Sequence, residues 1–82
     1  MNTFLGSLLL VPYNFAPAGW ALCNGQVLQI NQWQAVFALL GTNFGGNGTT
    51  EFALPNMPPV TDANGNQLTW IICLQGVFPS RD

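Results

Sequence analysis

Residues 31–41 read NQWQAVFALLG, and this stretch decides the fold class. Asn31 is a residue type favoured at a helix N-cap, Gln34 stands at the capping-box position, and Gly41 is placed to end a helix. Between them an apolar stripe recurs at helical spacing and consists of Trp33, Val36, Phe37 and Leu40. We therefore predict one short helix, at about residues 31–40, whose stripe packs on a sheet.

The rest of the chain has the pattern of short strands separated by turns. Strand-like composition or alternation is found in residues 4–11, 20–23, 26–30 and 68–75. Asn24–Gly25 predicts a hairpin between the second and third of these strands, and Asn64–Gly65 predicts another tight turn. The last strand is almost continuously apolar, so we expect it to be buried on both faces. The segments predict an α+β fold with a small antiparallel sheet, one short helix and long loops rich in glycine and proline.

The composition contains almost no charge. Charged residues make up 5% of the 82 residues, against about 25% in ordinary soluble domains. A monomer keeps itself soluble largely with mixed surface charge, whereas uncharged side chains are buried against a neighbour at much smaller cost than charged ones. A chain this short also buries only about 60–65% of its unfolded surface. We therefore expect one domain, residues 1–82, that associates with copies of itself.

The residue counts argue against several classes of function. With one Arg, no Lys and a net charge of −2, the chain lacks the basic footprint of a nucleic-acid-binding protein. The longest strictly apolar run, Leu8–Val11, is far shorter than the roughly 18–20 residues of a membrane span. Without His or Lys, a general acid–base pair or an activated nucleophile is hard to assemble. We expect no enzymatic activity, no cofactor, no metal site, no bound nucleic acid and no membrane span.

The two ends of the chain support two expectations. The apolar stretch at residues 4–11 resembles the core of a secretory signal peptide, but no Lys or Arg precedes it. We therefore expect an extracellular location that is reached without a recognisable signal peptide. We also expect both chain ends to be held by the sheet or by a neighbouring subunit, since free ends usually fray.

Two cysteines, Cys23 and Cys73, leave two interpretations open. They could form a disulfide that closes a long loop and contributes on the order of 4 kcal/mol. They could instead remain buried thiols that pack as small apolar side chains. If a disulfide forms, the sequence leaves open whether it lies within one subunit or between two.

Three tryptophans, Trp20, Trp33 and Trp70, leave another choice open. Exposed tryptophans could form a platform on which sugars stack, as in a glycan-binding adhesin. In a chain this short, however, bulky aromatic side chains are needed to build the core, and subunit interfaces also favour them. The core or an interface is the interpretation that we prefer.

Longer strings in the sequence point to a family. Residues 15–26 read FAPAGWALCNGQ, followed by FALLGT at 37–42, FGGNG at 44–48, FALPN at 52–56 and LQGVFPSR at 74–81. In this order and spacing they resemble the phage tail-collar family, which includes the microcystin-dependent proteins. The resemblance implies a structural role in short tail fibres or collars of phages and related bacterial elements, built as homo-oligomers, often trimers. It brings no catalytic residues with it.

The resemblance singles out structural positions. They are Gly19, Trp20, Gly25, Phe37, Gly41, Pro55, Gln75, Gly76 and Pro79. We expect Gly19 and Gly25 to supply turn geometry, Gly41 to end the helix, and Trp20 and Phe37 to fill the core. Every one of these roles concerns backbone shape or packing.

The chain departs from the family pattern by loss of charge and of an insertion. Asn24, Asn47 and Thr49 stand where the family usually has charged residues, and MPPV at 57–60 replaces a basic segment. The long insertion that usually precedes the last strand is reduced to a short bridge around residues 60–68. Receptor-binding structure carried by such an insertion is therefore not expected here.

Composition and resemblance together predict a structural subunit that self-assembles into a homo-oligomeric extracellular filament or tail-fibre-like appendage. The alternatives are a trimeric or ring component of a phage-like tail and a surface or glycan-binding adhesin module. The expected partners are copies of the chain itself and other tail or appendage proteins. The expected location is an extracellular appendage or a virion tail.

Overall fold

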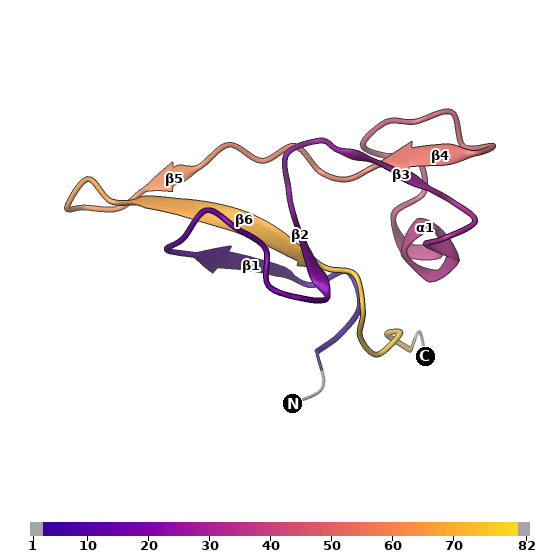
Figure 1. Ribbon diagram of the computed structural model, residues 1–82, viewed down its shortest axis with the longest axis horizontal. Coiled ribbons are helices and arrows are strands. Elements are labelled where there is room, and N and C mark those ends of the chain that lie inside the picture. The colour runs from indigo at the N-terminus through magenta and orange to yellow at the C-terminus, as the bar shows by residue number, and fades with distance from the viewer. Residues whose placement is uncertain (1–2, 81–82) are drawn as a thin grey trace.

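The computed structural model describes residues 3–80, which form two small antiparallel sheets and one helix (Figure 1). The larger sheet comprises β1 (Leu8–Val11), β2 (Trp20–Leu22), β5 (Val60–Thr61) and β6 (Gln67–Cys73). The smaller sheet pairs β3 (Val27–Gln29) with β4 (Glu51–Ala53), and α1 (Gln34–Leu40) lies beside it. The prediction of an α+β fold with a small antiparallel sheet and one short helix is confirmed. We call β3, β4, α1 and the loop at residues 41–50 the helical end.

β6 is the central strand of the larger sheet. β1 pairs antiparallel with one side of it, with Leu9 opposite Ile71. β2 pairs antiparallel with the other side, with Ala21 opposite Ile72. Side chains alternate between the two faces of a strand, and Ile71 and Ile72 are each 1% exposed. The C-terminal part of the last strand is therefore buried on both faces, as its apolar sequence predicted, whereas Gln67 at its start is exposed.

One hydrophobic core joins the larger sheet to the helical end. Its buried members are Leu5, Ala21, Cys23, Val36, Phe52, Leu54, Ile72 and Leu74. Phe37 of α1 packs on Phe52 of β4, with 5.4 Å between the ring centroids. Trp33 and Leu40 also pack against this core. The apolar stripe of the helix therefore faces the core, as predicted.

The helix is shorter than predicted. It begins at Gln34, because the N–H of Trp33 donates to the carbonyl of Ile30 in a turn that precedes it. Trp33, and not Asn31, is the N-cap, and no side chain caps the helix. Gly41 ends the helix as predicted, with a φ of 59° that an L side chain rarely adopts.

The prediction of a hairpin at Asn24–Gly25 is wrong. β2 pairs with β6, whereas β3 pairs with β4, so the strands on either side of this dipeptide belong to different sheets. Gly25 has a positive φ of 79°, but the chain runs on instead of turning back. The N–H of Met57 donates to the carbonyl of Cys23 at 2.8 Å, which extends the pairing of β3 and β4 past the dipeptide. A distant segment is therefore the pairing partner in place of the neighbouring strand.

The two described ends of the chain lie together. β1 begins later than predicted because Gly6, with a φ of 83°, forms a turn before it. Phe4 instead makes a separate parallel bridge with Val77. The expectation that both chain ends are held also concerns residues 1–2 and 81–82, which lie outside the described residues.

The second predicted turn, at Asn64–Gly65, is confirmed. It joins β5 to β6, and Val60 lies opposite Leu68 in the hairpin that results. Asp62 shapes the turn, because its carboxylate accepts the backbone N–H of Asn64 at 2.9 Å and that of Asn66 at 2.8 Å. These hydrogen bonds hold the pKa of Asp62 below its usual value, and the bond from the Asn66 N–H has the largest effect.

Candidate assembly surface

The molecule has more surface than a compact monomer of its size. Its radius of gyration is 13.3 Å, where about 12 Å is typical of a domain of this length. Its accessible surface is 5427 Å², where about 4,800 Å² is typical of a folded monomer of this mass. The long axis follows the larger sheet and the helical end, which lie side by side (Figure 1).

Much of this surface is apolar. Among residues 3–80, the large apolar side chains that are at least 37% exposed are Phe4, Leu8, Leu9, Tyr13, Phe15, Val27, Phe44, Val60, Val77 and Phe78. The charged side chains of the same residues are those of Glu51 and Asp62. Exposed apolar surface on this scale is typical of contact with another molecule, and so little charge does not keep copies of the chain apart.

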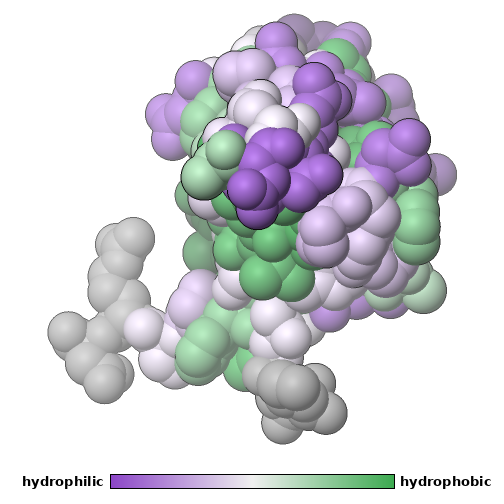
Figure 2. Space-filling model, turned by 90° about the vertical axis from the view of Figure 1, so that its left-hand side faces the viewer, coloured by the Kyte–Doolittle hydropathy of each residue, from purple (hydrophilic) through white to green (hydrophobic). Residues whose placement is uncertain are grey.

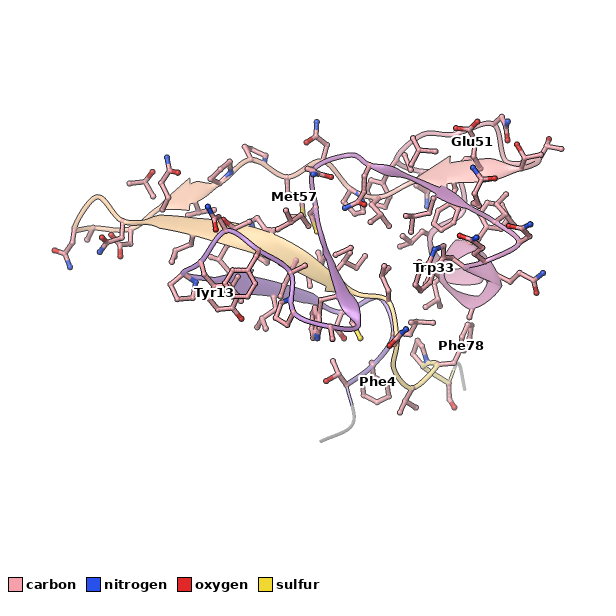
Figure 3. The ribbon with its side chains drawn as sticks, viewed as in Figure 1. Phe4, Tyr13, Trp33, Glu51, Met57 and Phe78 are labelled. Atoms are coloured by element: carbon pink, nitrogen blue, oxygen red, sulfur yellow. The ribbon has the colours of Figure 1, made fainter. Side chains whose placement is uncertain are left out.

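The exposed apolar side chains lie in several places. Phe4 and Phe78 lie together near the chain ends, beneath α1 (Figure 3), and are 59% and 50% exposed. Tyr13 lies in front of β1 and β6 in the same view, and its ring stacks on that of Phe15 at 4.6 Å. Figure 2 shows polar side chains over the tip of the β5–β6 turn and an apolar area between that tip and the chain ends. Surface that could be covered by a neighbour is therefore found on more than one side.

The loop at residues 41–50 closes the outer edge of β4. The side-chain oxygen of Asn47 accepts the backbone N–H of Glu51 at 3.1 Å, and the carbonyl of Glu51 accepts the N–H of Gly48 at 3.0 Å. The N–H of Ala53 donates to the carbonyl of Gly45 at 3.0 Å. Since these groups point away from β3, the loop occupies positions at which another strand could add.

The outer edge of β2 is also closed by its own chain. The side-chain amide of Gln26 donates to the carbonyl of Leu22 at 2.9 Å. The N–H of Trp20 donates to the carbonyl of Pro17 at 3.0 Å. Sequence reasoning did not identify Gln26 or Asn47 as edge-closing residues. An Asn followed by Thr49 and Thr50 in a glycine-rich loop was the available signal, because Asn side chains often accept backbone N–H groups in turns.

The glycines singled out by the resemblance lie where backbones approach closely. The carbonyl of Gly19 accepts the N–H groups of Leu74 and Gln75, at 2.8 and 3.2 Å. These two hydrogen bonds join the motif at residues 15–26 to the string at residues 74–81. A Cβ on Gly76 would lie 2.3 Å from the carbonyl oxygen of Thr3, so no larger residue fits there without a backbone shift.

The other singled-out positions have packing or backbone roles. Gly25 donates its N–H to the carbonyl of Pro55 at 3.2 Å, and Pro55 is buried. Trp20, which was expected to fill the core, is half-buried and does not belong to the core cluster. Pro79 is half-buried, whereas Gln75 is exposed. The structure does not gather these residues into one site. They are spread along the contacts between strands.

Cys23 and Cys73 are both buried, free thiols. Cys73 lies opposite Trp20 in the β2–β6 register, and the N–H of Cys23 donates to the carbonyl of Trp70. Because Trp70 and Cys73 are three positions apart on one strand, the two thiols lie on opposite faces of the sheet. The candidate disulfide within one chain is therefore not formed. Burial raises the pKa of the Cys23 thiol to about 11, so it stays protonated at neutral pH.

The tryptophans do not form an exposed platform. Trp20, Trp33 and Trp70 are each half-buried, and Trp33 and Trp70 pack against the hydrophobic core. The exposed aromatic side chains are those of phenylalanines and Tyr13 instead. The adhesin alternative depended on exposed tryptophans, and the structure gives it no such support.

The described residues offer little reactive chemistry. Within residues 3–80, no three His, Cys, Asp or Glu side chains come together to hold a metal ion. A hollow of about 240 Å³ is lined by amide, hydroxyl and aliphatic side chains of Gln29, Ile30, Asn31, Gln34, Thr49 and Thr50. It is smaller than most pockets for small molecules, which measure about 300–1,000 Å³, and none of its lining residues titrates. No helix in the described part of the chain has the length and apolar character needed to cross a membrane.

Comparison with known families shows whether the resemblance to the tail-collar family holds. The sequence model of the Phage Tail Collar Domain matches residues 6–59, which is more than half of the chain. The chain belongs to the phage tail-collar family. Neither the curated proteins nor the solved structures contain a match to it. This tail-collar domain therefore has a structural role of the phage tail-fibre kind, in a virion tail or phage appendage and among other tail-associated structural proteins.

The match ends before the last hairpin. It runs from the turn at Gly6 through β4 and stops before β5 and β6. The C-terminal string at residues 74–81 lies beyond it, so the resemblance of that string to the family stays a prediction. In this tail-collar domain the matched part folds onto a strand outside the match, because β6 pairs with both β1 and β2.

Proposed function

We propose that this tail-collar domain is a structural subunit that self-assembles into a homo-oligomeric filament or tail-fibre-like appendage outside the cell. The observation that supports this most is exposed apolar surface with almost no charge. Ten large apolar side chains of residues 3–80 are exposed, and the same residues contain two carboxylates and no basic side chain. Copies of such a subunit bury apolar surface against each other without removing charges from water.

The arrangement of the apolar side chains favours a subunit with more than one neighbour. They lie on β1, at the chain ends and at the helical end, namely Leu8 and Leu9, Phe4 and Phe78, and Val27 and Phe44. A two-fold dimer uses one self-complementary patch, whereas a filament uses patches whose contacts do not close. Rings and trimers also join different patches head to tail, so separate patches support an assembly larger than a two-fold dimer, among which we propose the filament. We also propose that residues 1–82 act as one domain, since one core joins both sheets.

Light scattering and negative-stain microscopy of the purified protein test the proposal. At micromolar concentration we expect a mass well above that of the 8.9 kDa chain, and long polymers in the micrographs. Uniform small particles without polymers would support the trimer or ring instead. A monomer in light scattering would contradict self-assembly in either form.

A further inference from the structure

The outer edge of β1 presents unpaired backbone groups. Beside this strand the N–H of Cys73 donates to the carbonyl of Ser7 at 2.9 Å. Bonded and non-bonded positions alternate along an antiparallel pair, so the odd-numbered residues of β1 direct their backbone groups toward β6. Leu8 and Leu10 direct theirs away from it. Among the described residues no segment other than β6 pairs with β1, so two N–H and two C=O groups face outward.

This open edge differs from the other edges of the molecule. The outer edges of β4 and β2 are closed by Asn47 and Gln26 and by neighbouring backbone groups. The edge of β3 is partly open, because Val27 directs its backbone groups outward and is 51% exposed. However, the carbonyl of Gln29, the other outward residue of β3, accepts the N–H of Gln32 at 3.2 Å. The outer edge of β5 (Val60–Thr61) is also open, but that strand has only two residues. β1, with two outward residues, is therefore the longest open strand edge of the described chain.

The side chains of β1 do not protect its edge. Natural sheets guard exposed edges with Lys, Pro, inward-pointing charge or a covering loop. β1 reads LLLV, with Leu8 44% and Leu9 47% exposed. No charged or proline residue interrupts the strand, and Pro12 comes after its end. An edge of this kind is a template for another uncharged strand.

We propose that the outer edge of β1 pairs with β1 of a second copy of this chain. The inference rests on the proposed self-assembly and names the surface that it uses. In an antiparallel pair centred on Leu9, Leu8 lies opposite Leu10 of the second copy, and each such pair exchanges two backbone hydrogen bonds. The two larger sheets become one continuous sheet with a two-fold axis. Apolar side chains meet across the junction, and no like charges oppose each other.

The occupant is a second copy because the edge is self-complementary. An outward N–H needs a carbonyl and an outward carbonyl needs an N–H, and the same four groups of another β1 supply both. A partner with a charged strand would place unpaired charge beside Leu8 and Leu9, where this chain offers no opposite charge. The contacts at the chain ends and at the helical end remain free to join such pairs into larger assemblies.

Sedimentation velocity of three variants tests the proposal. Leu8→Lys places a charge at the open edge, and Leu8→Pro removes an outward N–H while leaving the bonds to β6 in place. Thr61→Lys is the matched control, because Thr61 is an exposed residue of another edge strand, β5, and does not belong to the exposed apolar side chains. We expect both Leu8 variants to need at least about tenfold more protein to associate. Thr61→Lys should leave the pairing of β1 unchanged.

The outcomes separate this inference from the proposed function. If the wild type is a monomer, both fail. If the wild type assembles and a folded Leu8 variant assembles equally well, the β1 pairing is wrong while self-assembly stands. An equal loss in Thr61→Lys would also overturn the assignment to β1. Circular dichroism establishes that each variant is folded, and if Leu8→Lys does not fold, Leu8→Pro decides the result.

Discussion

In the helical end, the outward backbone groups of β4 are bonded by Asn47 and by glycines of the neighbouring loop, whereas in the larger sheet the outer side of β1 faces solvent. The helical end is formed by one continuous part of the chain, residues 27–53. The larger sheet combines segments from both ends of the chain, because β6 pairs with β1 and β2. The comparison indicates that the helical end closes the outer edge of β4 with its own loop. The larger sheet provides the edge to which another subunit can add.

The largest effect is expected from Gly46→Ala in the helical end. A Cβ at Gly46 would lie 2.4 Å from the Cα of Phe52, and its φ is 95°. The loop cannot then lie against β4, so we expect a loss of about 3 kcal/mol or more in the free energy of unfolding, measured with urea. Gly65→Ala is the control in the β5–β6 turn, where φ is also positive but no atom lies within 4 Å. It should cost only about 1 kcal/mol, and equal losses would mean that the loop contact does not hold β4.

The second prediction concerns the thiol of Cys23, which lies between β2 of the larger sheet and β3 of the helical end. Burial raises the pKa of Cys23 from 9.0 to about 11, so its thiolate fraction at pH 8 is roughly a hundredfold smaller than that of a free thiol. Iodoacetamide should modify Cys23 slowly in native protein and rapidly in urea, as peptide mass spectrometry can follow. Because this pKa is raised, the stability it contributes is complete below pH 9 and is lost as pH rises toward 11.

The same cysteines give a second readout. Since Cys23 and Cys73 lie on opposite faces of the sheet, reducing and non-reducing gels should show the same band. A faster-migrating non-reduced monomer would contradict the register of β2 on β6. A non-reduced dimer would instead mean that the thiols of two subunits meet.

A moderate effect is expected at Asn47. Its side-chain oxygen accepts the backbone N–H groups of Thr49, Thr50 and Glu51. We expect Asn47→Ala to lower the free energy of unfolding by about 1–2 kcal/mol, because these groups lose their acceptor. Asn47→Asp keeps the acceptor oxygen and should stay within about 0.5 kcal/mol of the wild type. If both variants lose the same stability, the oxygen is not what closes the β4 edge.

The smallest effect is expected at Asp62 in the β5–β6 turn. The N–H groups of Asn66 and Asn64 lower the pKa of its carboxyl. Because this pKa is lowered in the folded protein, the carboxylate stabilises the fold at pH values above its usual pKa of 3.8. This stability is lost as the pH falls through the lowered pKa. Asp62→Asn should therefore flatten the decline of the melting temperature in acid by a small amount. An unchanged acid profile would mean that the carboxylate does not shape the turn.

Local signals in the sequence predicted the end and the apolar stripe of the helix, but not its first residue or the pairing of the strands. The helix stop at Gly41 and the burial of Val36 follow from local conformation and periodicity, and both are confirmed. The prediction of a hairpin at Asn24–Gly25 was wrong, because turn propensity contains no information about the distant strands that pair with β2 and β3. The burial of the C-terminal part of β6 on both faces was predictable, because Ile71, Ile72 and Cys73 do not alternate with polar residues.

An uncharged surface with exposed apolar side chains was predictable from composition, but the positions of these side chains were not. The near absence of charge indicated contact with other copies, but tryptophans were the aromatic residues considered for exposure. Composition does not distinguish a core aromatic from a surface one, and the exposed aromatic side chains are those of Phe4, Tyr13, Phe15, Phe44 and Phe78. The open edge of Leu8 and Leu10 depends on the register with β6, which needs the three-dimensional pairing.

Amide hydrogen exchange of the wild-type protein tests the central claim most directly. The Ala53 N–H is bonded within the chain, so it should exchange slowly both in dilute monomer and in the assembly. The Leu8 and Leu10 N–H groups should exchange rapidly when dilute and become slow in the assembly, where a second β1 accepts them. If they exchange equally fast in both states while the protein is assembled, the larger sheet does not join subunits through β1.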